Sequence, residues 1–78
     1  MYKVYVVKQR RGGSEVIKES RTTTFSIVAA RAAWADLYAA GFDHRHLLLL
    51  THDGQKLAVF RYQSTPGDPD YVPPGDPL

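Results

Sequence analysis

The sequence contains no cysteine, which excludes disulfide bonds and every zinc site that needs a thiolate ligand. It also lacks any apolar run near the roughly 20 residues that cross a bilayer. Its first residues have the pattern of a β-strand rather than the apolar core of a signal peptide. These absences predict a soluble domain in a reducing compartment, the cytoplasm, with no membrane partner.

Catalytic motifs are missing as well. None of the four serines lies in a nucleophile elbow, and the chain has neither a glycine-rich phosphate loop nor a dinucleotide fingerprint. His44 and His46 lie beside Asp43, but a stable metal site usually needs a third or fourth ligand, and His52 is about 20 Å further along an extended strand. A domain of about sixty residues also has little room for a deep substrate cavity. We therefore expect no enzyme, no cofactor and no metal.

Acidic charge and proline are scarce in most of the chain and concentrated at its end. Residues 1–63 contain all ten Lys and Arg residues, five acidic residues and no proline, for a net charge of +5. Residues 64–78 contain three Asp, no base and all five prolines, with Pro-Gly-Asp-Pro at 66–69 and 74–77. This composition predicts one folded domain over residues 1–63 and a flexible, acidic, Pro-rich tail over residues 64–78. Alternatively, the tail folds back on the basic face or serves as a Pro-rich ligand.

The first part of the chain has the pattern of a β-hairpin. Residues 2–8 and 14–24 are rich in β-branched and aromatic side chains, which favour extended structure. Between them, Gly12 and Gly13 can adopt the positive φ angles that a tight turn requires. We expect two antiparallel strands here.

A helix is expected over residues 27–40, which hold seven alanines and no helix breaker. Ser26 is a suitable N-cap, and Gly41 is suited to the left-handed conformation that ends many helices. Phe25, just before the cap, is placed to pack on Ala30 as a hydrophobic staple.

A second hairpin follows the helix. Residues 44–51 include four consecutive leucines, typical of a strand that is buried on both faces. Asp53-Gly54 then forms a two-residue turn into residues 56–63, where apolar side chains alternate between two sides. The order ββαββ predicts the α+β class: a four-stranded, mostly antiparallel sheet with one helix on one face.

The helix has two apolar sides. We expect one side, with Trp34 as its central anchor, to pack on the sheet; it consists of Ile27, Ala30, Trp34 and Leu37. The opposite side carries an unusual stripe of small residues, namely Val28, Ala32, Ala35 and Ala39. Either alanine occurs there as the best helix former, or the stripe packs closely on a partner helix.

The uncovered face of the sheet raises the same question. If Ala58, Phe60 and Tyr62 face the helix, then Leu57, Val59 and two of the leucines face away from it. Such a patch is larger than a monomer usually exposes. The leading hypothesis is therefore a small interaction or regulatory protein, a homodimer or the binder of another protein, acting through its helix or its open sheet face.

Basic residues suggest the alternative function. They cluster in the first hairpin, near Tyr2 and Tyr5, and are Lys8, Arg10, Arg11, Lys18 and Arg21. Bases interleaved with aromatic residues can bind phosphates and stack on nucleobases, which suggests a nucleic-acid-binding module. Against it, Glu15 and Glu19 dilute the charge, and a charged hairpin tip also keeps a sheet edge soluble.

Overall fold

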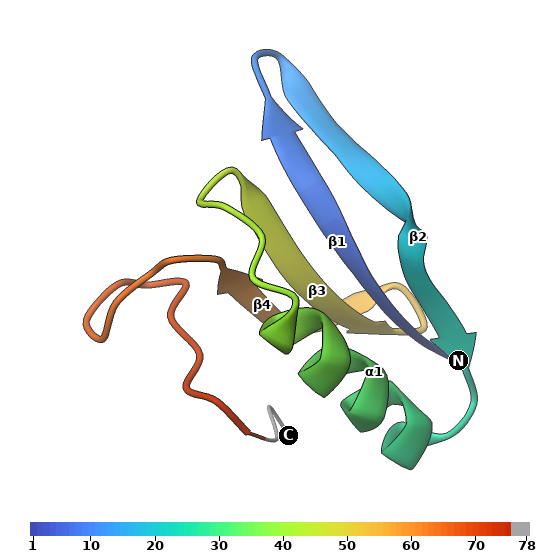
Figure 1. The fold of residues 1–78 in the computed structure, drawn as a ribbon. Coiled ribbons are helices and arrows are strands. Elements are labelled where there is room, and N and C mark those ends of the chain that lie inside the picture. Colours follow the sequence, from blue (N-terminus) through green and yellow to red (C-terminus); the bar gives the residue numbers. More distant parts are fainter. Residues whose placement is uncertain (76–78) are drawn as a thin grey trace.

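The chain folds into one four-stranded antiparallel sheet and a single helix in the order ββαββ, which confirms the predicted α+β class (Figure 1). The structure is a computed structural model and describes residues 1–75. Its elements are β1 (Tyr2–Arg10), β2 (Gly13–Thr24), α1 (Ile27–Ala39), β3 (His46–His52) and β4 (Gln55–Arg61). The strand order is β2-β1-β3-β4, so the two hairpins lie side by side and β1 pairs with β3 in the centre.

Helix α1 begins and ends at the predicted signals. The Ser26 side chain accepts a hydrogen bond from the backbone N–H of Ala29 at 3.2 Å, as expected of an N-cap. Gly41, two residues beyond the last helical residue, has a φ of 73°, which a residue with a Cβ adopts only under strain. The predicted staple is wrong: Phe25 is 80% exposed and Ala30 is buried in the core.

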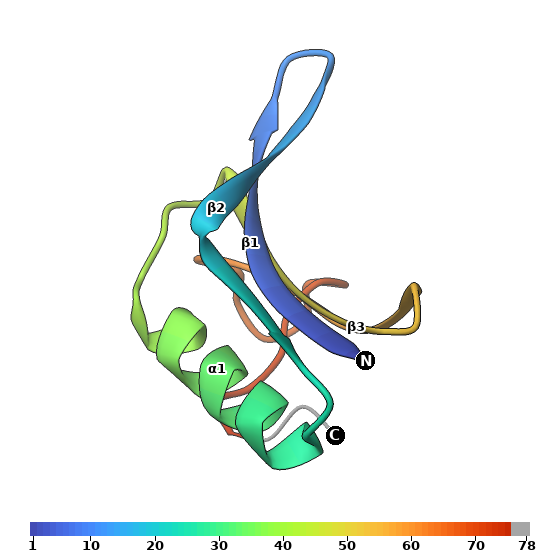
Figure 2. The same ribbon diagram turned by 90° about the vertical axis from the view of Figure 1, so that its right-hand side faces the viewer.

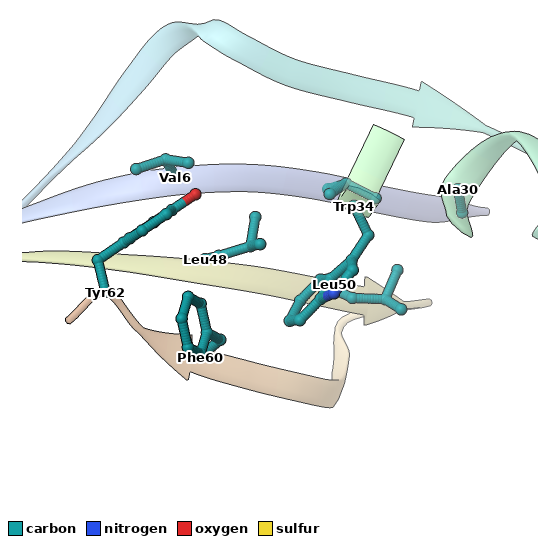
Figure 3. Packing of buried hydrophobic residues seen from close by; sticks show 8 residues of the cluster. Val6, Ala30, Trp34, Leu48, Leu50, Phe60 and Tyr62 are labelled. Carbon is teal, nitrogen blue, oxygen red and sulfur yellow. The ribbon is translucent and has the colours of Figure 1, made fainter. Parts of the chain in front are cut away.

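The core lies between α1 and the sheet. Trp34 is fully buried there and points from the helix toward the strands, as expected (Figure 3). The core comprises Val4, Val6, Ala30, Trp34, Leu48, Leu50, Phe60 and Tyr62. Phe60 pairs with Leu48, and Leu48 pairs with Val6, so these three core residues share the sheet face that α1 covers. Phe60 and Tyr62 therefore face the helix, as predicted.

The pairing of β2 with β1 is interrupted by a bulge, which the sequence did not indicate. Val4 pairs with Thr22 but Val6 pairs with Ile17, so four residues of β2, 18–21, lie opposite Tyr5 alone. The Ser20 hydroxyl closes this bulge: it accepts a hydrogen bond from the Val6 N–H at 2.9 Å and donates its own proton to the Ile17 carbonyl at 2.6 Å. The hydroxyl thus replaces the backbone acceptor that Val6 loses at the bulge.

The segment after β4 contacts the domain. The backbone N–H of Arg61 donates to the Asp70 carbonyl at 3.0 Å, and the Arg61 Nε lies 3.3 Å from an Asp70 carboxylate oxygen. The Tyr38 hydroxyl donates to the Val72 carbonyl at 2.8 Å, and Val72 packs against the core. Part of the tail therefore runs past β4 and along α1 (Figure 1). Its flexibility stays a prediction, and residues 76–78 lie outside the described residues.

Candidate interaction surfaces

The sheet has one covered face and one open face. Helix α1 lies on one side of the sheet, and no second helix or strand layer lies on the other within residues 1–75 (Figure 2). Cross-strand partners share a face, so the pairs Val7–Leu47 and Leu49–Val59 place these four residues together on the side away from the helix. We call the apolar residues of this side the open face: Tyr5, Val7, Val16, Leu47, Leu49 and Val59. Leu57 is exposed beside them, at a bulge of β4 where it has no cross-strand partner.

The open face is apolar at its centre and basic at its margin. Val7 and Leu49 are almost fully covered by their neighbours, whereas Val16 and Leu57 are each 40% exposed. Lys3 and Lys56 flank the apolar rows, since both pair with Thr51 of β3. Of the predicted interface residues, the strand pairing places Val59 on this face, and Leu57 lies two residues from it, exposed at the bulge of β4.

The helix stripe lies on a different surface. Val28 is 70% exposed, and Ala32, Ala35 and Ala39 are exposed along the side of α1 that faces away from the sheet. Phe25, just before the helix, is also 80% exposed. The stripe is accessible, but alanine side chains contribute little apolar area each.

The predicted basic cluster divides into separate groups. Lys8, Arg10 and Arg11 line one hollow, whereas Arg21 lines a second one with Lys3, Tyr5 and Val16. The second hollow measures about 210 Å³ and belongs to the open face. Lys18 is exposed in the bulge of β2 and lines neither hollow.

The hollow around Lys8 includes a cation that sequence reasoning missed. It measures about 510 Å³ and is lined by Lys8, Gln9, Arg10, Arg11 and Arg45, a set that we call the basic cradle. The pairing of β1 with β3 ends at Lys8 and His46, and the Gln9 N–H then donates to the Arg45 carbonyl at 2.7 Å. This contact joins residues 36 positions apart, so no local sequence signal could have placed Arg45 beside the hairpin.

Asp43 holds the Arg45 loop in place. One carboxylate oxygen accepts the Arg45 backbone N–H at 2.9 Å and lies 2.9 Å from the His46 Nδ1, and the other is 3.4 Å from the Arg45 guanidinium. The backbone N–H of Arg45, followed by the His46 side chain, lowers the pKa of Asp43 to about 2. Asp43 is therefore ionised at neutral pH and fixes the position of Arg45.

The three histidines lie apart in the structure. His46 is nearly buried, and its ring lies 4.9 Å from that of Phe42. His44 is exposed outside β3, and His52 stacks on Tyr2 at the far end of the strand. Within the described part of the chain, no three His, Asp or Glu residues are grouped closely enough to hold a metal ion.

Comparisons with known proteins add no functional information. No protein family, curated protein or solved structure matches this chain significantly. Among residues 1–75, no helix is long and apolar enough to cross a membrane. What the chain could bind must therefore be inferred from its own surfaces.

Proposed function

We propose that this chain is a small, non-enzymatic interaction protein that forms a homodimer through the open face of its sheet. One observation carries the proposal: an apolar sheet face, with Val16 and the neighbouring Leu57 each 40% exposed, is covered by no second layer among residues 1–75. Burying such a face releases water from apolar area, which is the main source of free energy in protein association. The cysteine-free sequence supports a cytoplasmic site of action.

A second copy of the chain matches this face in chemistry, because two identical apolar sheet faces can pack on each other. A standard interface buries about 800 Å² per partner, roughly 16% of the 5025 Å² surface of this molecule. Two sheets pack face to face about 10 Å apart, with their inner side chains interleaved. The central rows hold apolar residues, and the cations lie at the margin, where they keep contact with water.

The open face is favoured over the helix stripe because of side-chain size. The stripe offers one valine and three alanines, whereas the open face offers leucines, valines and a tyrosine. Since apolar stabilisation scales with buried area, the larger side chains contribute more to association.

Light scattering coupled to size-exclusion chromatography tests the proposal over a wide range of protein concentration and salt. We expect a salt-insensitive species of twice the 8.7 kDa chain mass. Leu57→Glu should raise the dimer dissociation constant by about 100-fold or more, because burying an unpaired carboxylate costs at least ~3 kcal/mol. Leu57 is partly exposed and lies at a bulge, so the variant should still fold, which circular dichroism checks.

Ala35→Glu is the matched control. It introduces the same charge on the exposed side of α1 and should leave the dimer intact. A wild-type monomer at every concentration would overturn the proposal. Dissociation by Ala35→Glu but not by Leu57→Glu would place the interface on the helix instead.

A further inference from the structure

The basic cradle lies apart from the open face, where the first hairpin extends beyond β3 (Figure 1). Its four cations come from two segments, β1 with its turn and the loop before β3. Glu15 and Asp43 are the acidic residues paired with them, so the local charge stays positive. The tertiary structure creates this concentration of charge, because Arg45 is remote in sequence from the other three cations of the cradle.

The cradle cations are available to a ligand. Lys8 and Arg11 form no ion pair with any other residue of the described chain. Arg10 pairs with Glu15 and Arg45 with Asp43, but both arginine side chains remain about 60% exposed. Solvent-exposed ion pairs contribute only about 0–1 kcal/mol, so a stronger anion can replace these carboxylates at little cost.

The cradle is also ordered before any ligand arrives. The Gln9 N–H holds the Arg45 carbonyl, and the Arg61 guanidinium donates to the Gln9 side chain at 2.8 Å and to the His44 carbonyl at 3.3 Å. Asp43 fixes the Arg45 backbone from the other side. Binding therefore requires the ordering of side-chain ends rather than of a loop, which reduces the entropic cost.

The lining identifies the ligand class. All five cradle residues are polar, so the hollow lacks the buried aromatic or aliphatic anchor on which protein partners usually depend. Three are arginines, whose planar guanidinium groups match phosphate with paired hydrogen bonds. The projecting element is a two-stranded ribbon, which the major groove of a DNA duplex admits, and Gly12 and Gly13 keep its tip narrow.

We propose that the basic cradle binds the phosphate backbone of double-stranded DNA, with the tip of the β1–β2 hairpin directed into the major groove. The contacts are to phosphates, so binding is independent of base sequence. This site does not depend on the proposed dimer, because the cradle and the open face are formed by different residues.

Fluorescence anisotropy of the full chain with a labelled DNA duplex of arbitrary sequence tests this site. Three or four phosphate contacts predict a slope of about −3 in a plot of log K against log salt concentration, or a loss of at least ~40-fold between ~50 and ~200 mM salt. Arg11→Glu, Lys8→Glu and Arg45→Gln should each weaken binding about 5-fold or more and make the slope shallower.

Lys56→Glu provides the matched control. It makes the same charge change as Lys8→Glu, on an exposed residue near the β3–β4 turn at the other end of the sheet (Figure 1). Its effect on binding should stay within about threefold, since salt screens charges beyond a Debye length. Circular dichroism of each variant confirms folding. Because Lys56 lies at the margin of the open face, light scattering checks that Lys56→Glu keeps the oligomeric state of the wild type.

Several results would overturn the site. One is equal loss of binding in Lys56→Glu and Lys8→Glu, which would indicate an effect of net charge alone. Others are no detectable duplex binding at low salt, equal competition by polyglutamate, and tighter binding of single-stranded DNA. Leu57→Glu distinguishes failure of the cradle from failure of the dimer. This variant should disrupt the dimer but should leave the salt dependence of duplex binding by each cradle unchanged.

Discussion

At the scale of single residues, Tyr62 shows how one polar atom joins the sheet to the helix. Its ring lies in the core near Phe42 and Phe60, and its hydroxyl donates a hydrogen bond to the Leu37 carbonyl in the last turn of α1. Burial raises the pKa of Tyr62 to about 12, because the phenolate would lose its hydration. The folded protein therefore holds this proton more tightly than the unfolded chain does.

Tyr62→Phe should lower the free energy of unfolding by about 1 kcal/mol at neutral pH, since the Leu37 carbonyl loses its donor. In the wild type, the stabilisation from the raised pKa is complete below about pH 10 and is lost as the pH rises toward 12. Urea unfolding across this range should give a steeper decline for wild type than for the variant. Equal declines would show that the Tyr62 hydroxyl is not protected from water.

The pKa of Tyr38 is also raised, by burial and then by the nearby Tyr71. Both proteins in the Tyr62 comparison keep Tyr38, so the difference between their pH profiles isolates Tyr62. Tyr38→Phe is a useful second variant, since the hydroxyl of Tyr38 donates to the Val72 carbonyl in the C-terminal segment and not to the helix.

At the scale of elements, the bulge in β2 separates the two halves of the first hairpin. The half near the turn carries the cradle, and the half near Thr24 leads into the helix cap. A bulge bends the bulged strand and increases its twist. The Ser20 hydroxyl is the group that keeps both halves in one sheet, because it satisfies the Val6 N–H beneath the bulge.

Ser20→Ala should lower the free energy of unfolding by about 1–3 kcal/mol, because the buried Val6 N–H would lose its acceptor. Ser14→Ala is the control: it lies exposed in the same strand, where most substitutions change stability by less than about 0.5 kcal/mol. Chemical denaturation measures both. If both substitutions changed the free energy of unfolding by the same small amount, a water molecule would have to replace the Ser20 hydroxyl as the acceptor for the Val6 N–H.

At the scale of the whole molecule, one helix does not cover the full width of the sheet. α1 packs across β1, β2 and β3, and the Tyr38 ring reaches Phe60 of β4 with ring centroids 4.4 Å apart. Val72 extends this cover from the C-terminal segment. The tail therefore contributes to the core even though its composition is that of a solvated chain.

Val72→Asp should destabilise the domain by about 1–2 kcal/mol and loosen residues 64–72, since it places a carboxylate against the core. Val28→Asp is the matched control: the same substitution at an exposed helix position should change stability by less than about 0.5 kcal/mol. Backbone 15N relaxation reports on the segment directly. Fast motion of residues 68–72 in the wild type would contradict the docked arrangement and support the flexible tail predicted from composition.

The helix, the strands and their order could be predicted from local sequence signals. Ser26 and Gly41 mark the ends of the helix, and Asp53-Gly54 and Gly12-Gly13 mark the turns, because backbone dihedral preferences and capping act over a few residues. Alternation along the last strand likewise predicted which side faces the core, since side-chain direction has a period of two.

The composition of the two candidate surfaces depends instead on contacts between segments that are distant in sequence. The central pairing of β1 with β3 created the uncovered rows of the open face and brought Arg45 to the first hairpin. The same holds for the Ser20 bulge and for the contact between Arg61 and Asp70. Each of these features depends on how strands and loops meet in space, and local propensities carry no information about such contacts.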